Sequence, residues 1–368
     1  MDTANRLRLC DDSFCEDVTY TEKSVDIAQV GAYIGGVLLP DDRVVFVPHY
    51  ATTIGIGTFD PTTNAYSTVA GAPGGGGYSG GVLLPDGRIV FVPYYATTIG
   101  IFNPATNAYS TIAGLPGDFA YCGGVLLPDG RVVFVPHFAT TIGIFDPTTN
   151  AYSTISGPLG KGKYAGGVLL PDGRVVFIPC NAKTIGIFNP ATNAYSTIAG
   201  PPGCAAFSGG VLLRDGRVVF VPCYAKTIGI FDPATNEYST IAGAPGGCAY
   251  EGGVLLPDGR VVFVPRYATT IGIFDPATNA YGTIAGASGN YAYAGGVLLR
   301  DGRVVFVPYD AKSIGILTLS DEKARARARL RTEAVRQELI AAAWHPKRMT
   351  AWCLDTGERR ELAEMGVD

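Results

Sequence analysis

One segment of this chain occurs seven times, and the repeat decides what the chain can fold into. A representative copy, GGVLLPDGRVVFVPHFATTIGIF, spans residues 123–145. Self-similarity at a fixed period indicates one repeat architecture rather than several independent domains. The Gly-Gly pairs that open the copies are separated by 45 residues once and by 43 residues thereafter, and they begin at Gly35, Gly80, Gly123, Gly166, Gly209, Gly252 and Gly295.

Each complete repeat predicts four short strands. In the third copy they are GGVLL, RVVFV, TIGIF and AYSTI, joined by the turn sequences PDG and DPTTN. Pro, Asp, Asn and Gly at these positions favour tight turns. The unbroken apolar run RVVFV predicts a strand that is buried on both faces. Four-stranded units of about 40–50 residues are typical of propeller blades, so the sequence predicts an all-β, seven-bladed β-propeller.

The two ends of the repeat region predict how the ring closes. The last copy stops at SIGILTLS (313–320) and lacks its fourth strand, whereas SVDIAQVGAYIGG (24–36) aligns with the segments that lead into the other copies. We therefore expect Ser24–Ala28 to supply the missing strand, because closure removes the exposed edges of an open ring. The expected domains are an N-terminal extension (1–23), the propeller (24–319) and a C-terminal helical tail (320–368).

The C-terminal tail differs in composition from the repeats. The segment 320–344 begins with serine and acidic residues and continues with strong helix formers, which predicts an α-helix that ends at His345-Pro346. A second short helix is expected over 358–365. The sequence AAAWHPKRMTAWCLD (341–355) resembles a Trp-His-Pro tail found in algal and giant-virus proteins.

Composition and charge limit the classes of partner. Charged residues make up only 16% of the chain and the net charge is −4, which gives no general attraction to nucleic acid or to an anionic membrane. The N-terminal residues contain no apolar segment of the kind found in secretory signals, and no apolar run approaches the roughly 18 residues of a membrane helix. Several of the eight cysteines lie singly in loops that differ between repeats, which does not favour a disulfide framework. We expect a cytoplasmic monomer that binds no nucleic acid, no membrane, no metal and no cofactor.

The repeat also resembles that of a known family. The run GGVLLPDGRVVFVP…TIGIFDPATN is similar to the repeat of the streptogramin lyase-like propellers, and more distantly to kelch and NHL repeats, over residues 24–319. The resemblance implies the propeller fold, and in the lyase-like enzymes histidine and glutamate act with a divalent metal at the channel mouth. In this chain the position before Gly-Gly never holds histidine, and Val-Pro replaces the Gly-Gly that ends the second strand of kelch repeats. The resemblance therefore supports the propeller fold more strongly than it supports the lyase activity.

Comparison of the copies predicts two different faces. The nearly identical PDGR and DPATN turns should lie on one face of the ring, which we call the constant face. The second-to-third strand turns and the inter-blade loops should lie on the other, which we call the variable face. Because loops on a rigid scaffold often carry specificity, the variable face is the expected binding surface for a protein or a small ligand. The residues that follow Val-Pro (Ile-Pro in the fourth copy) on it are His49, Tyr94, His137, Cys180, Cys223, Arg266 and Tyr309.

Residues that recur in every copy are interpreted as structural. The Asp and Arg of PDGR, such as Asp129 and Arg131, are expected to pair between blades. An aromatic residue begins each inner strand, and we expect these rings to pack around the channel mouth, with ligand contact as the alternative. They are Tyr33, Tyr78, Tyr121, Tyr164, Phe207, Tyr250 and Tyr293.

Few side chains of the variable face suggest chemistry. His49 and His137 are two blades apart, so we expect them to be too distant to share a metal ion. The loop cysteines suggest a thiol or zinc site, but the spacing of the blades favours isolated small residues; they are Cys122, Cys180, Cys204, Cys223 and Cys248. A positive patch for an acidic ligand is a further alternative, formed by Lys183, Lys226, Lys312 and Arg266.

Glu251 is the only carboxylate that directly precedes Gly-Gly, and Arg266 lies in the same blade. We expect the two to form a salt bridge, with a base and an electrophile as the alternative. The sequence therefore predicts a non-catalytic binding scaffold that acts through the variable face. The alternative is a metal-assisted lyase or hydrolase at the channel mouth, which would use Glu251, Arg266 and one of His49 or His137.

Overall fold

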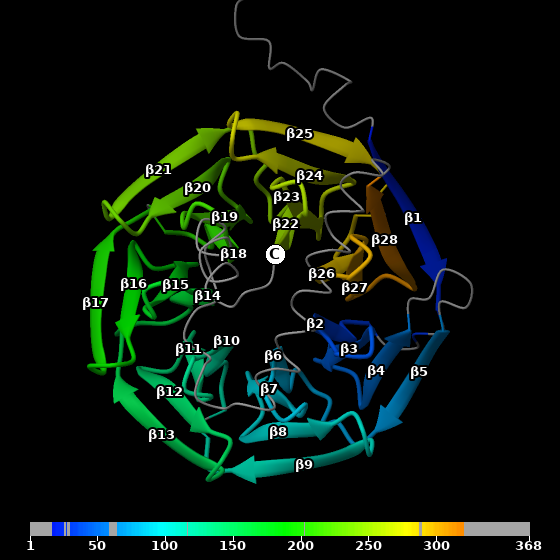
Figure 1. The fold of residues 1–368 in the computed structure, drawn as a ribbon, viewed down its shortest axis with the longest axis vertical. Coiled ribbons are helices and arrows are strands. Elements are labelled where there is room, and N and C mark those ends of the chain that lie inside the picture. Colours follow the sequence, from blue (N-terminus) through cyan, green and yellow to red (C-terminus); the bar gives the residue numbers. More distant parts are fainter. Residues whose placement is uncertain are drawn as a thin grey trace, which may run out of the picture.

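The protein forms a ring of seven antiparallel sheets around a central axis (Figure 1). The structure, a computed structural model, describes residues 17–319 except 26, 28, 29, 59–64, 116, 202, 287 and 288. Each sheet has four strands, so the predicted seven-bladed β-propeller is confirmed. The two helices expected after residue 319 lie outside the described residues. Within the described part of the chain, no helix has the length and apolar character needed to cross a membrane.

The first four blades are each built from consecutive strands. Blade 1 contains β2 (Tyr33–Leu38), β3 (Arg43–Pro48), β4 (Thr53–Thr58) and β5 (Ala65–Ala70). Blade 2 contains β6 (Tyr78–Leu83), β7 (Ile89–Pro93), β8 (Thr98–Asn103) and β9 (Ala108–Ala113). Blade 3 contains β10 (Tyr121–Leu126), β11 (Val132–Pro136), β12 (Thr141–Asp146) and β13 (Ala151–Ser156). Blade 4 contains β14 (Tyr164–Leu169), β15 (Val175–Pro179), β16 (Thr184–Asn189) and β17 (Ala194–Ala199).

The remaining blades complete the ring. Blade 5 contains β18 (Phe207–Leu212), β19 (Val218–Pro222), β20 (Thr227–Asp232) and β21 (Glu237–Ala242). Blade 6 contains β22 (Tyr250–Leu255), β23 (Val261–Pro265), β24 (Thr270–Asp275) and β25 (Ala280–Ala285). Blade 7 combines β26 (Tyr293–Leu298), β27 (Val304–Pro308) and β28 (Ser313–Leu319) with β1 (Val18–Ser24) from the start of the described chain.

The strand that closes the ring is not the one expected. The N-terminal strand does pair with β28, but it spans Val18–Ser24 instead of Ser24–Ala28. Tyr20 takes the place of the fourth-strand tyrosine of other blades, with its hydroxyl 2.9 Å from that of Tyr293. The connection from β1 to β2 is one residue longer than that from β5 to β6. The propeller therefore begins at Val18.

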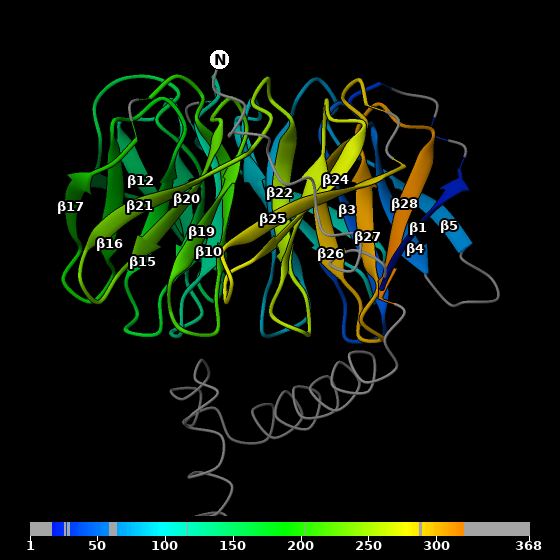
Figure 2. The same cartoon turned by 90° about the horizontal axis from the view of Figure 1, so that it is seen from above.

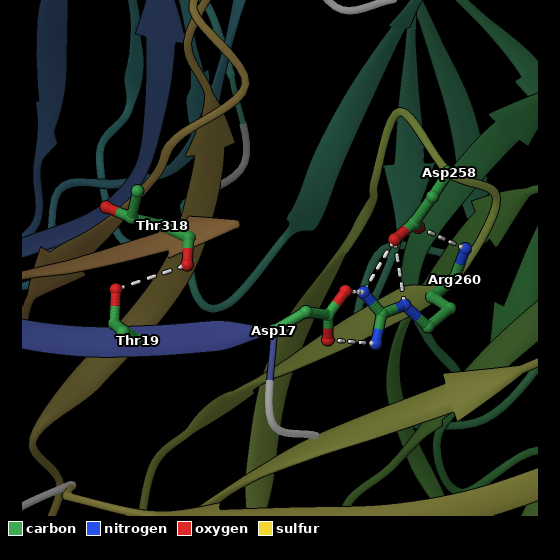
Figure 3. A network of polar contacts seen from close by, with 5 residues as sticks. All are labelled: Asp17, Thr19, Asp258, Arg260 and Thr318. Atoms are coloured by element: carbon green, nitrogen blue, oxygen red, sulfur yellow. Dashed lines mark hydrogen bonds and ion pairs between the residues drawn. The ribbon is translucent and has the colours of Figure 1, made fainter. Parts of the chain in front are cut away.

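Side chains add a second link at the closing seam (Figure 3). Arg260, on the constant face of blade 6, donates hydrogen bonds to both carboxylate oxygens of Asp17, at 3.0 and 2.6 Å. The same guanidinium pairs with Asp258 of its own turn at 2.7 Å. Thr19 Oγ1 donates to the carbonyl of Thr318 at 3.4 Å. Asp17 is thus fastened to blade 6, and β1, which directly follows it, is fastened to β28.

The core lies between neighbouring blades. As predicted, the second strand is buried on both faces, and Val132, Val133 and Phe134 of β11 have no exposed surface. One hydrophobic cluster joins Val90 and Val92 of blade 2 to Phe134 of blade 3, and equivalent clusters recur around the ring. Burial of apolar side chains in these layers is the main force that holds the blades together.

The ring of inner-strand aromatics does not surround the channel mouth, so that expectation is wrong. Tyr121 is fully buried, and its ring crosses its own blade to place its hydroxyl 2.6 Å from that of Tyr152 on the fourth strand. A Cβ atom on Gly143 of the third strand would lie 3.1 Å from the ring of Tyr121. The glycine of TIGIF therefore makes room for this ring. Tyrosine pairs of this kind occur in six blades, but Phe207 has no hydroxyl to offer Tyr238 in blade 5.

The constant face is held by its own side chains. The side view shows the strand connections gathered at the two faces of the ring (Figure 2). In the turn of blade 2, Arg88 pairs with Asp86 at 2.7 Å and donates to the carbonyl of Pro147 in blade 3. The Asp–Arg pair lies within one turn, and only the arginine reaches the next blade, which corrects the expected pairing between blades.

Candidate binding site on the variable face

The residue after Val-Pro is fixed by backbone hydrogen bonds on both sides. The N–H of His137 donates to the carbonyl of Ala120 in the preceding inter-blade loop at 2.9 Å. Its carbonyl accepts the N–H of Lys163 in the following loop at 3.0 Å. The same pair of bonds recurs at all seven positions. Because the frame uses only backbone atoms, the side chain at this position is free to differ from blade to blade.

These side chains form a continuous arc over five consecutive blades. Ring centroids are 5.9 Å apart for Tyr309 and His49, 5.7 Å for His49 and Tyr94, and 5.8 Å for Tyr94 and His137. The Arg266 guanidinium lies 5.6 Å from the centre of the Tyr309 ring. Tyr94 therefore separates the two histidines, as their spacing in the sequence predicted.

Each of the two histidines is held in one tautomer. The Nδ1 atoms of His49 and His137 lie 2.7 and 2.8 Å from the carbonyl oxygens of Tyr78 and Tyr164. A carbonyl only accepts, so each Nδ1 carries the proton and each Nε2 is left as the acceptor. Burial lowers the pKa of both imidazoles, more than these hydrogen bonds raise it. Both are therefore neutral at pH 7.

Glu251 and Arg266 form an ion pair, as the sequence predicted. Both side chains are largely buried, with 18% and 22% of their surface exposed. The guanidinium also stacks over the ring of Tyr291 at 4.9 Å. The carboxylate is thus engaged by a permanent cation, which leaves it poorly suited to accept a proton from a substrate.

A cavity opens beside this pair. Its volume is about 460 Å³, and it is lined by Val30, Gly31, Tyr50, Arg266, Tyr291, Tyr309 and Asp310. Asp310 accepts a hydrogen bond from the N–H of Gly31 at 2.8 Å. Arg266 Nε is buried and has no hydrogen-bond partner among the described residues. Three tyrosine rings and the Arg266 guanidinium line the cavity, which suits a small group that carries an apolar ring.

A buried lysine was missed by sequence analysis. Lys163 is 3% exposed, and its Nζ lies within hydrogen-bond distance of four backbone carbonyl oxygens, two of them at 2.7 Å. Burial lowers its pKa to about 8. The other blades have Ala or Gly at this position, so the signal was a charged residue at a site of otherwise small residues. Lys183, Lys226 and Lys312 are instead exposed.

The expectation that the loop cysteines are isolated is wrong for one pair. The Sγ atoms of Cys223 and Cys248 lie 2.6 Å apart. Cys122 Sγ is 3.3 Å from Ser79 Oγ of the neighbouring blade, and burial raises its pKa. Cys180 is half-buried and Cys204 is exposed. The sequence did carry the signal for the pair, because both residues belong to the two loops that meet at the mouth of blade 5.

The mouth residues do not fit a divalent metal of the lyase-like type. Across the described residues, no three His, Cys, Asp or Glu side chains lie close enough together to hold a metal ion. Glu251 is occupied by Arg266, and Tyr94 stands between the two histidines. The positions that precede Gly-Gly in the other blades carry Ile34, Ser79, Cys122, Ala165, Ser208 and Ala294.

The strand topology and the residues at the channel mouth thus describe a seven-bladed propeller with one constant face and one variable face. Among solved structures, the chain is similar to a streptogramin B lyase, with 21% identity, a TM-score of 0.71, and coverage of 83% of this chain and 98% of that one. It is also similar to a catalytically inactive virginiamycin B lyase from Staphylococcus aureus with quinupristin, with 19% identity, a TM-score of 0.71, and coverage of 82% and 99%. At this identity the likeness shows the fold alone. No family model and no curated protein matches the chain.

Proposed function

We propose that this propeller is a non-catalytic binding scaffold and that the variable face is its binding surface. The proposal rests on the location of the exposed hydrophobic side chains. The large hydrophobic side chains exposed among the described residues all belong to loops of the variable face, and they are Val30, Tyr50, Tyr95, Leu159 and Tyr224. Apolar groups gathered on one face of an otherwise polar surface are typical of interaction sites.

The state of the polar groups at the mouth supports binding over catalysis. Glu251 is neutralised by Arg266, and one nitrogen of each histidine is committed to the backbone. Tyrosine is abundant in binding surfaces because its rigid ring contributes contact area at a low entropic cost. The cavity beside Arg266 would accept one side chain or one ring of a larger ligand.

A capture experiment with matched variants tests the proposal. The full chain is immobilised as wild type, as a variable-face variant (Tyr50→Ser, Tyr95→Ser, Tyr224→Ser) and as a constant-face control (Thr106→Ala, Thr192→Ala, Thr235→Ala). All six positions are exposed, so we expect unchanged melting temperatures. A cell lysate is passed over each immobilised protein. Lysate proteins that bind both the wild type and the control should not bind the variable-face variant. Equal retention by the two variants would overturn the proposal.

The second candidate function is a lyase, favoured by the solved streptogramin lyase neighbours. Quinupristin, which is present in one of those structures, is the appropriate probe. Incubation of the full chain with quinupristin and a magnesium salt should leave the compound unchanged by chromatography and fragmentation mass spectrometry. A new product that forms with wild type and disappears with Glu251→Gln would establish the lyase and refute the scaffold.

A further inference from the structure

Blade 5 brings two thiols into contact at the channel mouth. Cys223 directly follows β19, and Cys248 lies in the loop between β21 and β22. Their sulfur atoms are 2.6 Å apart, and each residue has only 6% of its surface exposed. A covalent bond between two sulfurs is about 2.0 Å long. Small side-chain rotations would therefore bring this pair to bonding distance.

The backbone of the blade explains why the two side chains meet. The N–H of Ala249, next to Cys248, donates to the carbonyl of Cys223 at 3.2 Å. In blade 2 the equivalent bond joins Ala120 and Tyr94 at 2.9 Å. In every blade, the carbonyl of the residue after Val-Pro is therefore hydrogen-bonded to the inter-blade loop that follows.

The side chains at these two positions also touch in other blades. In blade 2 they are Tyr94 and Phe119, whose ring centroids are 4.9 Å apart. In blade 6 they are Arg266 and Tyr291, with the guanidinium 4.9 Å from the ring centre. Contact at this pair of positions is therefore not peculiar to blade 5. Blade 5 is the one in which both positions hold cysteine.

The surroundings favour a reactive thiolate at Cys248. A hydrogen bond from Cys223 lowers the pKa of Cys248, burial acts to raise it, and the positive charge of Arg266 lowers it further. The thiolate is the form of cysteine that attacks a disulfide. Cys223, whose pKa is raised by the same hydrogen bond and by burial, is the protonated partner.

We propose that Cys223 and Cys248 are a dithiol modification site that closes to a disulfide by exchange with a small-molecule disulfide. The Cys248 thiolate attacks one sulfur of that molecule, forms a mixed disulfide and releases one thiolate. Cys223 then loses its proton, attacks Cys248 Sγ and expels the second thiolate. The protein dithiol is oxidised by two electrons, and the small disulfide is reduced to two thiols. This inference does not depend on the proposed binding function.

Peptide mapping of the wild-type chain tests the proposal without a variant. The reduced full-length protein is incubated with glutathione disulfide, alkylated and digested with trypsin without reductant. Cleavage after Lys226 separates VVFVPCYAK (218–226) from the peptide 227–260, and each contains one cysteine. We expect these two peptides to appear joined, lighter by two hydrogen atoms, and to separate on reduction. Two alkylated, unjoined peptides would overturn the proposal.

Single variants assign the two roles. Cys223→Ala should keep glutathione attached to Cys248, because no second thiol is present to displace it. Cys248→Ala should lose both the joined peptide and the glutathione adduct on Cys223. Alanine is compatible with this loop position, since Ala205 occupies it in the preceding inter-blade loop. Cys204→Ala is the matched control and should leave the joined peptide unchanged. A glutathione adduct on Cys223 in Cys248→Ala would reverse the assignment and refute the attack by Cys248.

Discussion

The constant and variable faces use the same blade frame in opposite ways. On the constant face the side chains are part of the frame, since Arg88 pairs with Asp86 and also bonds to the carbonyl of Pro147 in the next blade. On the variable face the backbone of the mouth residue makes both bonds to the neighbouring loops, as at His137. On the constant face the side chains link the blades, so the same residues recur in every blade. On the variable face backbone atoms link the blades, so the side chains are free to differ.

The largest effect is expected where the inner strands meet below the variable face. Gly252 has a φ of +81°, and a Cβ atom there would lie 2.9 Å from the Cα of Gly295 in the next blade. Gly259, in the constant-face turn of the same blade, has a φ of +98° and nothing within 4 Å of a Cβ. Gly259→Ala should lower the free energy of unfolding by about 1–2 kcal/mol through backbone strain alone.

Gly252→Ala should cost a further ~1–3 kcal/mol, because the added methyl group meets backbone that cannot rotate away. Urea denaturation of both variants measures the difference. Equal losses would show that the inner strands have room to separate and that the mouth is less rigid than its spacing indicates.

The next effect distinguishes two arginines of the constant face. Arg260 binds both Asp258 and Asp17 and has only 12% of its side-chain surface exposed. Arg131 has 34% exposed and pairs with Asp129. Arg260→Ala should lower the free energy of unfolding by ~2 kcal/mol, since two partly buried carboxylates lose their partner. Arg131→Ala should cost ~0–1 kcal/mol. A smaller loss for Arg260→Ala than for Arg131→Ala in chemical denaturation would contradict the role of Asp17 at the seam.

Acid should weaken the constant face. Partial burial acts to raise the pKa of Asp86, but hydrogen bonds and the charge of Arg88 outweigh it, so the pKa is lowered. The arginine of the same turn likewise lowers the pKa of the other turn aspartates, which are Asp41, Asp129, Asp172 and Asp215. A carboxylate with a lowered pKa in the folded state stabilises the fold above its unfolded pKa of about 3.9, and this stabilisation is lost as the pH falls through the folded value.

Denaturant unfolding at a series of pH values from about 6 down to about 2.5 measures this loss. Asp86→Asn should make the pH dependence in the acid range shallower, because one titrating group is removed. An unchanged pH profile for Asp86→Asn would show that its pairing contributes nothing to the fold.

The smallest effect concerns the tyrosine pairs that join the first and fourth strands within a blade. Phe207→Tyr should give the hydroxyl of Tyr238 a partner and raise stability by ~0.5–1 kcal/mol. Tyr121→Phe removes the partner of Tyr152 and should lower stability by a similar amount. Melting temperatures of the two variants should therefore move in opposite directions. A shift in the same direction would show that ring packing, and not the hydroxyl pair, decides stability at this position.

The sequence predicted those features that periodicity encodes. The number of blades, the buried second strand and the closure of blade 7 by an N-terminal strand all follow from the repeat. The position of that strand was wrong, because Ile27 and Ala28 imitate the Ile-Ala that ends other fourth strands, whereas the residue that fixes the register is Tyr20. The direction of Tyr121 and the contact of Cys223 with Cys248 were also missed. Both are contacts between different positions of the repeat, which a comparison of equivalent positions does not measure.

The pairing of β1 with β28 has a consequence for synthesis of the chain. Val18 pairs with Leu319, so the two strands of this pair stand at opposite ends of the propeller sequence. Six blades assemble from neighbouring strands, but β1 leaves the ribosome first and meets its partner last. Contacts between residues far apart in sequence form slowly because a long loop must close first. Until then, β1 is an unpaired strand that β28 of a second nascent chain could capture, so the seam is where exchange of strands between molecules would begin.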